Sequence, residues 1–434
     1  MNTVDIITKK RDGGELTEAE IRHMVLNYTS GELPDYQMSA FLMAVYFKGM
    51  SREETIALTR IMKESGDVVD LSRIKGVKVD KHSTGGVGDK TTLIVGPVAA
   101  ACGVPVAKMS GRGLGFTGGT VDKLESIPGF MISMDNDAFI NQVNSRGIAV
   151  IGQTGHIAPA DKKIYALRDV TGTVENLSLI TSSIMSKKLA SGSDAILLDV
   201  KCGRGAFMKN EEDAVKLAEL MVDIGKADGK ETMAVITDME QPLGRAVGNS
   251  LEVEEAIGVL KNQGPEDITE LSLTLAGMMV YMGKKAATVE EGIELAERAL
   301  ADGSALKKFR AFVSGQGGNP DITENTGILP SCAHRLELTA AEDGYVSEID
   351  AMRIGLASQH TGAGRQRKED DIDPAAGLYL HKKVGEGVRQ GELLCTIYGN
   401  NVKKIEKSLE EVKNAVKISR KQPEKNKLIK KIIK

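Results

Sequence analysis

The sequence predicts an α/β protein: a small, discontinuous all-helical domain hinged to a larger mixed α/β domain, followed by a strand-rich C-terminal α/β domain. Three observations predict this fold class. Residues up to about Ser65 carry only helical patterns, and from Val77 onward strand-like runs alternate with helical segments. From Thr339 to Tyr398, short strand-like runs are separated by glycine-containing turns. The expected domains are residues 1–70 plus 161–193, residues 71–160 plus 194–330, and residues 331–434.

The N-terminal helices are marked by their caps. Thr17 with Glu20, and Ser51 with Glu54, have the spacing of a capping box, which satisfies backbone N–H groups at a helix start. A helix that begins after Pro34 is apolar on more than one face, so both faces are expected to be covered. Packing in the core and contact with a second subunit explain this pattern equally well.

The middle of the chain has the pattern of a mostly parallel sheet covered by helices. The expected strands are Val77–Asp80, Val104–Met109, Ile148–Gly152, Ala195–Val200 and Thr232–Thr237. A helical insertion, Asp161–Ser193, interrupts them and is long enough for two helices. We expect it to pack with the N-terminal helices, so that short hinges join the two domains and allow the cleft between them to close on a ligand.

The C-terminal part of the chain has hairpins of the type found in carrier and barrel-sandwich modules. No lysine there has the sequence context of a lipoyl or biotinyl site, so we expect a structural role. A helix is predicted over Asn401–Ile418, and the lysine-rich segment Lys421–Lys434 is predicted to be a solvated tail.

The composition excludes several classes of protein. The net charge of −4 and the 4% content of aromatic residues argue against binding to nucleic acid. No apolar run approaches the length of a membrane span, so no membrane association is expected. The cysteines are far apart and lack metal-ligand spacing, which predicts reduced thiols in a cytoplasmic protein. They are Cys102, Cys202, Cys332 and Cys395.

Two glycine-rich turns are the strongest functional signal. The segments Asp80–Thr92 and Ser110–Thr120 each follow a strand-like run and lead into a helical segment. Glycines let the backbone approach a ligand closely, and the N–H groups at a helix start attract anions. Lys81 and His82 add a positive charge and a titratable group. Because the carboxyl ends of neighbouring parallel strands meet at one edge of the sheet, the two turns predict a phosphate site.

A third cluster lies in the helical insertion. Ser183 and Lys187 are four residues apart and therefore share a helix face, and Arg168 lies near the end of the preceding helix. Taken alone, such residues are more often an exposed face than a site. Across a hinge from a phosphate site, a guanidinium, a hydroxyl and an ammonium group are suited to a flat ligand that carries carbonyl oxygens.

These motifs resemble the thymidine and pyrimidine-nucleoside phosphorylase family. The similarity is carried by residues 81–89, 110–115, 117–129 and 182–188, and it extends over nearly the whole chain. It implies phosphorolysis of uridine, thymidine and deoxyuridine by inorganic phosphate, which yields the free base and ribose or 2-deoxyribose 1-phosphate. It also implies a homodimer formed through the helical domain, a potassium ion, and no organic cofactor.

By matching position, the resemblance assigns site residues. Phosphate is expected to bind Lys81, Ser83, Thr92, Lys108, Ser110 and Thr120. The base is expected to bind Arg168, Ser183 and Lys187. The expected catalytic residues are His82, Arg168 and Lys187. The potassium ion is expected at Gly88, Lys90, Leu243, Ala246 and Glu255, through backbone carbonyls and one carboxylate.

The residue types agree with this chemistry. Cleavage of the glycosidic bond places negative charge on the departing base, and donors aimed at its carbonyl oxygens stabilise that charge. His82 is also a candidate proton donor. No Ser/His/Asp triad is evident, and the reaction needs no covalent enzyme intermediate.

Two positions bear on specificity. Phe116 stands where relatives commonly have histidine, which removes a polar group near the cleft. Lys108 is typical of the broad-specificity branch, so both uridine and thymidine are expected substrates. The alternatives are a thymidine-specific phosphorylase and, less favoured, an anthranilate-type phosphoribosyltransferase, which would need acidic magnesium ligands such as Asp122 and Glu125. A dinucleotide-dependent oxidoreductase and a nucleoside-binding protein without activity are further alternatives.

Overall fold

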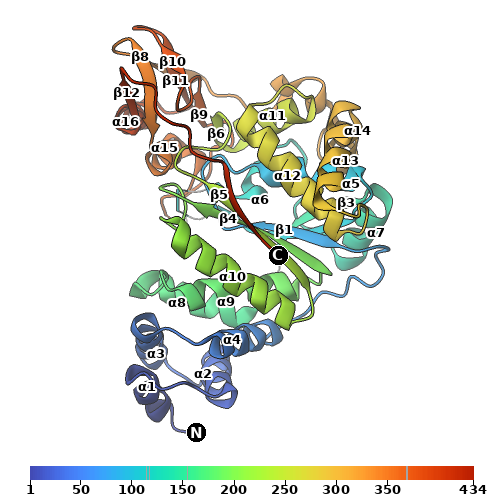
Figure 1. The fold of residues 1–434 in the computed structure, drawn as a ribbon, viewed down its shortest axis with the longest axis vertical. Coiled ribbons are helices and arrows are strands. Elements are labelled where there is room, and N and C mark those ends of the chain that lie inside the picture. The colour runs from blue at the N-terminus through green and yellow to red at the C-terminus, as the bar shows by residue number, and fades with distance from the viewer. Residues whose placement is uncertain (114, 117, 154, 368–369) are drawn as a thin grey trace.

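The computed structural model describes residues 1–434 except 114, 117, 154, 368 and 369. It is an elongated molecule with a helical bundle at one end, a sheet layered between helices in the middle, and a second strand-rich region at the other end (Figure 1). This order of domains agrees with the fold class predicted from the sequence. None of the described helices is long and apolar enough to cross a membrane.

Six helices form the bundle end of the molecule. They are α1 (Thr3–Arg11), α2 (Glu18–Ser30), α3 (Asp35–Lys48), α4 (Arg52–Glu64), α8 (Pro159–Thr171) and α9 (Leu177–Ala190). Both predicted capping boxes are present, at Thr17 and Ser51. One hydrophobic cluster joins α1–α4 to the inserted helices through Ala160, Ile164 and Leu179. The prediction of a discontinuous helical domain is therefore confirmed, while its limits in residue numbers stay a prediction.

The central sheet is parallel except at one edge. Its strands follow the order β1 (Val79–Ser83), β4 (Ala195–Cys202), β5 (Glu231–Asp238) and β13 (Ile429–Ile433). The first three pair in parallel, and β13 pairs antiparallel with β5. A separate parallel pair, β2 (Val106–Ser110) and β3 (Ile148–Gly152), lies beside this sheet. Each predicted strand of this region is present, with ends displaced by up to three residues.

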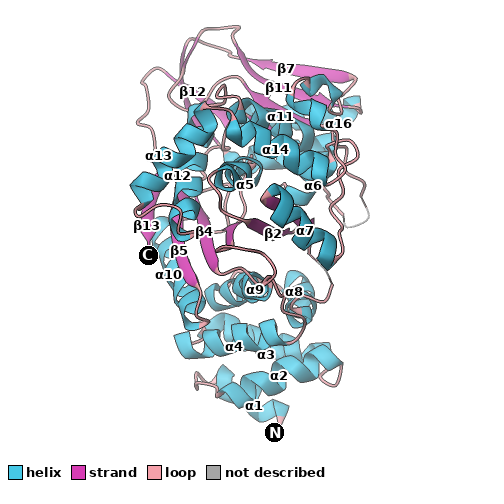
Figure 2. Cartoon of the chain, turned by 90° about the vertical axis from the view of Figure 1, so that its right-hand side faces the viewer, coloured by secondary structure: helices cyan, strands magenta, loops and turns pink. Residues whose placement is uncertain are grey.

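Alternate side chains of these strands enter two different hydrophobic clusters, as the two-residue period of a strand requires. Leu197 and Val235 pack with helices that include α5 and α12, whereas Ile196 and Ile236 pack with α9 and α10. Figure 2 shows the helices on both sides of the strands. The remaining helices here are α5 (Thr91–Ala101), α6 (Thr120–Glu125), α7 (Asn136–Arg146), α10 (Glu211–Ala227), α11 (Asn249–Leu260), α12 (Glu266–Met282), α13 (Val289–Ala301) and α14 (Ser304–Gly315).

Among its described residues, the C-terminal region contains two antiparallel sheets, two α-helices and a short π-helical segment, Gln359–Ala363. The first sheet has the order β6 (Ala246–Val247), β9 (Gly377–Leu380), β11 (Leu393–Gly399) and β7 (His334–Thr339). The second has the order β10 (Gly387–Val388), β8 (Gly344–Ile349) and β12 (Val416–Ser419). The helices are α15 (Ala351–Ser358) and α16 (Val402–Ala415). Because β6 comes from the central domain, the first sheet joins the two regions.

Two C-terminal predictions are wrong. The helix predicted to reach Ile418 ends at Ala415, and the chain continues as β12. The segment Lys421–Lys434 is not a solvated tail, because it contains β13, which covers the free edge of β5. The many lysines hid this strand, although no residue of β13 is fully buried, so its lysines can keep their charge there.

Three segments of the chain run between the helical bundle and the central sheet, and backbone hydrogen bonds join them to one another. The N–H of Asp67 donates to His156 O and that of Val69 donates to Ala190 O, each at 2.9 Å. A Cβ atom added at Gly192 would lie 2.1 Å from Val69 O, so no side chain fits at this crossing. Gly192 also has a φ of +84°, which glycine adopts without strain. The crossing between the two domains is therefore compact.

Candidate active site

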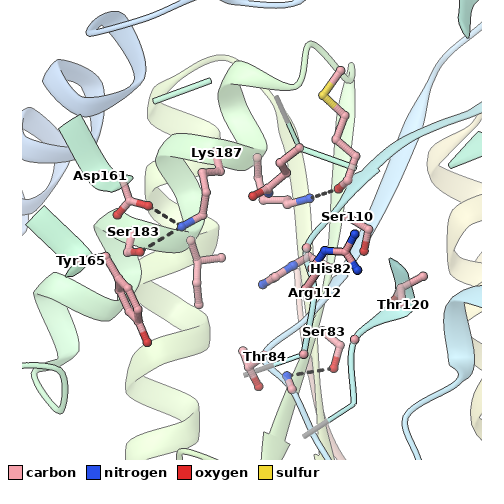
Figure 3. Close-up of a pocket in the computed structure, with 18 of the residues that line it drawn as sticks. His82, Ser83, Thr84, Ser110, Arg112, Thr120, Asp161, Tyr165, Ser183 and Lys187 are labelled. Atoms are coloured by element: carbon pink, nitrogen blue, oxygen red, sulfur yellow. Dashed lines mark hydrogen bonds and ion pairs between the residues drawn. The ribbon is translucent and has the colours of Figure 1, made fainter. Parts of the chain in front are cut away.

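A cavity of about 670 Å³ lies between the helical domain and the sheet domain. Figure 3 shows two groups of side chains that face each other across it. Residues of α8 and α9 line one wall, and the ends of β1 and β2 with their glycine-rich turns line the other. The predicted arrangement, with two turns on one side and a polar cluster on the other, is the one that the structure has.

The wall formed by the two glycine-rich turns, here called the turn wall, contains five of the six residues predicted to bind phosphate. They are Ser83, Thr92, Lys108, Ser110 and Thr120. Thr92 lies in the first turn of α5 and Thr120 begins α6, so both are near backbone N–H groups that lack helical partners. This wall therefore has the hydroxyl, ammonium and backbone donors that a phosphate dianion needs.

The sixth predicted phosphate residue, Lys81, is not among the residues that line the cavity. Its ammonium group is buried below the turn, where it donates to Thr91 Oγ1 at 2.5 Å and lies 3.3 Å from Asp199 Oδ2. The reason is the buried carboxylate of Asp199, which needs compensating positive charge. Lys201 Nζ, 2.8 Å from the same oxygen, supplies the rest.

A second buried carboxylate, Asp80, joins three elements under the cavity. Its Oδ1 accepts a hydrogen bond from Lys108 Nζ on β2 at 3.1 Å, and its Oδ2 accepts one from Lys188 Nζ on α9 at 2.9 Å. Burial would raise the pKa of Asp80, but the two ammonium groups outweigh burial and lower it to about 2. Lys188 also donates to Met109 O at 3.1 Å. The floor of the site is thus fixed by ionic bonds.

His82 follows on the same strand and lines the cavity (Figure 3). Burial and the positive charges of Lys188 and Lys108 hold the pKa of His82 well below its usual value, against the attraction of Asp80. The imidazole is consequently neutral near pH 7 and can donate one N–H hydrogen bond. The predicted role as a proton donor is narrowed to hydrogen bonding, because the imidazolium form is disfavoured.

On the helical wall, Ser183 and Lys187 lie together as predicted. Lys187 Nζ donates to Ser183 Oγ at 3.1 Å and to Asp161 Oδ2 at 2.5 Å (Figure 3). These two bonds use two of the three N–H groups of the ammonium, and the serine hydroxyl retains its own proton. Both side chains line the cavity, so they can donate to a ligand while Asp161 fixes the lysine in place.

Arg168, the third predicted base-binding residue, is buried but reaches the cavity. Its guanidinium donates to three backbone carbonyls, those of Thr173, Val174 and Leu179, at 2.7–3.2 Å. Burial lowers the pKa of Arg168 to about 10, against the attraction of Asp161, so the group stays charged near pH 7. Three of its five N–H groups hold the α8–α9 loop and the first turn of α9, which leaves two for a ligand.

Three of the five predicted cation ligands lie together, but the ammonium group of Lys90 already binds them. Lys90 Nζ donates to Ala246 O at 2.8 Å, to Leu243 O at 3.1 Å and to Glu255 Oε2. Burial opposes the charge, yet the attraction of Glu255 outweighs it and raises the pKa of Lys90. Because the ammonium bonds three of the oxygens that the resemblance assigns to potassium, these residues, as arranged, do not fit a further cation.

The expectation for Phe116 also needs correction. This side chain is not among those that line the cavity; it lies in a smaller pocket next to α15, where its ring and carbonyl approach Gly355. Phe116 therefore contacts the C-terminal domain, and it does not determine the polarity of the cleft.

Sequence reasoning missed two residues of the helical wall, Asp161 and Tyr165, which line the cavity beside Arg168. These three residues have the i, i+4, i+7 spacing of one helix face, a signal that was available. It also missed Asp80 and Asp199 as counterions. A carboxylate inside a buried strand was the available signal, because such a group needs a partner.

The class of protein that the fold and the site indicate is the glycosyl transferase family, because two established domains of that family match the chain. The helical bundle domain of that family matches residues 4–66 and its a/b domain matches residues 75–306. A third family, described as the pyrimidine nucleoside phosphorylase C-terminal domain, matches residues 345–419.

Individual relatives make the assignment narrower. The chain is 58% identical over 400 residues to a pyrimidine-nucleoside phosphorylase of Geobacillus stearothermophilus, with 92% of each chain covered. It is 55% identical over 416 residues to the enzyme of the same name from Staphylococcus haemolyticus, with 94% of this chain and 96% of that one covered. The chain belongs to the pyrimidine-nucleoside phosphorylase family. An anthranilate phosphoribosyltransferase from Thermus thermophilus shares the fold, with a TM-score of 0.59, 20% identity, and coverage of 72% of this chain and 99% of that one.

The Asp80 contacts give a testable prediction. Asp80→Asn leaves two buried ammonium groups without a counterion, and loss of one partner of a buried ion pair costs about 3–5 kcal/mol. Tm is expected to fall by roughly 10 °C, measured by calorimetry. Because folding lowers the pKa of Asp80, its stabilisation is full above the unfolded value and is lost as pH falls toward 2. The Tm difference should therefore be constant from about pH 5 to 7 and narrow at lower pH.

The matched control is Asp137→Asn, because the carboxylate of Asp137 is 72% exposed in its pair with Arg73. This change should shift Tm by only about 1–2 °C. Equal effects of the two substitutions would contradict the assigned role of Asp80.

Proposed function

We propose that this protein catalyses the phosphorolysis of pyrimidine nucleosides, with inorganic phosphate as co-substrate and closure of the cleft around both. One observation carries the proposal: anion-binding turns and a cluster of donors suited to a pyrimidine base face each other across one cavity. The family to which the chain belongs supports the same reaction.

Phosphate binds at the turn wall in this proposal. Ser83, Ser110 and Thr120 offer hydroxyl groups, and Lys108 offers a positive charge. The bound dianion stabilises the positive charge that develops on the sugar and is positioned to attack its anomeric carbon. Lys81 acts from below the turn, where its bonds to Thr91 and Asp199 hold the backbone donors in place.

The base binds at the helical wall. Arg168, Ser183 and Lys187 donate hydrogen bonds to its carbonyl oxygens, and neutral His82 donates one more from the opposite wall. As the C–N bond breaks, its electron pair moves to the base, and these donors stabilise the resulting anion. A phosphate oxygen forms the new bond to the anomeric carbon, and the departing base takes its proton from water.

A specific contact disfavours the phosphoribosyltransferase alternative. Asp122 and Glu125, its only candidate magnesium ligands beside the second turn, both bind Arg112. The distances from the Arg112 guanidinium are 3.0 Å to Asp122 Oδ1 and 2.8 Å to Glu125 Oε1. Carboxylates neutralised by arginine are poor ligands for a divalent cation.

The direct test is the release of free base from uridine and from thymidine, each with and without inorganic phosphate. Release with phosphate should exceed release without it by about 100-fold or more, because phosphate is the nucleophile. Ser183→Ala should lower kcat/KM by about 10-fold through loss of one donor. Ser178→Ala, on the same helix but bonded to Met50 O, is the control and should leave it unchanged. Phosphate-independent release, or none from either nucleoside, would refute the proposal.

We also propose that Lys108 lets the enzyme accept ribose as well as 2-deoxyribose. It lines the cavity at the end of β2, next to the phosphate turns. Burial lowers the pKa of Lys108 to about 8. The negative charge of Asp80 opposes this change, and the positive charge of Lys188 adds to it. The group is therefore a charged donor below that pH and loses its charge above it.

This proposal predicts a pH-dependent preference. The ratio of kcat/KM for uridine to that for deoxyuridine should fall as pH rises through about 8, because the neutral amine is a weaker partner for the 2′-OH. Both substrates have the same base, so ionisation of the base cancels in the ratio. In Lys108→Met the ratio should be lower and independent of pH. Turnover of 2′-deoxy substrates alone by the unmodified protein would rule the proposal out.

We further propose a homodimer formed through α3. That helix buries one face in the bundle and exposes large apolar side chains on another: Tyr36 at 74%, Met43 at 36% and Phe47 at 75%. Such a cluster of exposed apolar side chains is typical of an interaction surface. α3 lies at the end of the molecule away from the C-terminal region (Figure 1).

Light scattering after size-exclusion chromatography tests the dimer. The mass should be twice the 46.5 kDa of one chain. Phe47→Asp should yield a monomer at micromolar concentration, because a buried charge at the interface is unfavourable. Val402→Asp is the control, since Val402 is 46% exposed on α16. A monomeric unmodified chain, or a Phe47→Asp variant that remains dimeric, would argue against this interface.

A further inference from the structure

The side chain of Lys90 is fully enclosed although it carries a charge. Its side chain is 0% exposed, and that of its partner Glu255 is 5% exposed. Three acceptors surround the ammonium: Leu243 O, Ala246 O and a carboxylate oxygen of Glu255. An ammonium group has three N–H donors, so each of them has one acceptor.

The surrounding backbone leaves no space for another ion. A Cβ atom added at Gly244 would lie 3.0 Å from Lys90 Nζ and 2.2 Å from Glu255 Oε2. One added at Gly88 would lie 2.4 Å from Leu243 O. Both glycines have positive φ, at +67° and +72°, so the backbone itself closes around the ammonium group.

The three acceptors come from segments that the ammonium joins to the phosphate turn. Lys90 directly precedes α5, at the end of that turn. Leu243 lies in the loop between β5 and β6, Ala246 is the first residue of β6, and Glu255 lies on α11. The turn and the loop are also joined through the backbone, because the Leu243 N–H donates to Val87 O at 3.0 Å. The position of Lys90 Nζ thus couples the turn to the loop and to α11.

We propose that the ammonium group of Lys90 takes the place of a monovalent cation at this site, so that the phosphate turn is held in its working arrangement without potassium. A primary ammonium has the same charge as a potassium ion and a similar size, and carbonyl and carboxylate oxygens bind both. A covalently attached cation stays in place at any salt concentration. A second cation at the same oxygens would be repelled by the first.

The test compares chloride salts of potassium, sodium and tetramethylammonium at equal ionic strength, after thorough dialysis against the last. In each salt, Tm is measured by calorimetry and phosphorolysis by release of base. For the unmodified protein, rates should agree within about twofold and Tm within about 1 °C, because no cation binds preferentially to the folded state. Stimulation by potassium or a potassium-dependent rise in Tm would overturn the proposal.

Two substitutions remove the ammonium in different ways. Lys90→Ser leaves space and an extra oxygen, so in tetramethylammonium its Tm and rate should fall and potassium should restore them. Lys90→Met fills the space without charge, so it should be impaired in every salt. Lys284→Thr is the matched control, because Lys284 is 59% exposed in its pair with Glu231, and it should behave like the unmodified protein.

The outcomes remain separable from those of the proposed function. The activity measurement rests on that function, but the Tm comparison does not, so a protein without phosphorolysis still tests the role of Lys90. If the Lys90 variants fail to fold, the salt comparison on the unmodified protein decides alone. A Lys90→Ser variant that is as stable as the unmodified protein without potassium would refute the proposal.

Discussion

The active-site floor depends on one buried carboxylate, that of Asp80. It receives an ammonium group from β2 and another from α9, and it brings both walls of the cavity to a common point. Burial and the same pair of ammonium groups hold the pKa of His82 well below its usual value, so the imidazole beside this contact is neutral. In a site that must bind an anion, positive charges that are already fixed below the ligand mean that the surrounding side chains need not reorganise when phosphate binds.

Buried lysines repeat this arrangement in the sheet domain and where the C-terminal region meets it. Lys90, Lys123 and Lys383 each donate to backbone carbonyls of distant segments and lie within 3.2 Å of a carboxylate. A buried ion pair is weak evidence of stability, because desolvation offsets the attraction. Here the buried ion pairs position the backbone, because an ammonium group with three donors fixes loops that no strand or helix holds. The backbone carbonyls of these loops would otherwise be buried without partners.

The sequence was sufficient for the fold class and for both walls of the site, because each depends on local signals. Capping boxes, strand–turn–helix repeats and the Ser183–Lys187 spacing are visible within short windows, and the structure has them. What could not be predicted depends on partners far apart in the chain. The pairing of β13 with β5 joins segments almost 200 residues apart. Tertiary packing likewise determines which charged side chains and backbone carbonyls contact Asp199 and Lys90. The position of Lys81 below the turn, rather than in the cavity, is a consequence of the same long-range charge pairing.

The placement of α9 constrains how the cleft closes. Lys187 and Lys188 are neighbours in sequence, yet the first faces the cavity and the second binds Asp80 on the sheet domain. Near this end, Met185 and Leu189 pack with the sheet domain, whereas Leu179 near the other end packs with the helical bundle. In the proposed closure of the cleft, we place the pivot near the end of α9 that Lys188 and Gly192 fix. Close to a pivot the displacement is small, so Lys187 keeps its distance from the phosphate turns. Arg168 and Tyr165 lie on α8, farther from that point, so the proposed closure would move them most and would complete the base-binding part of the site.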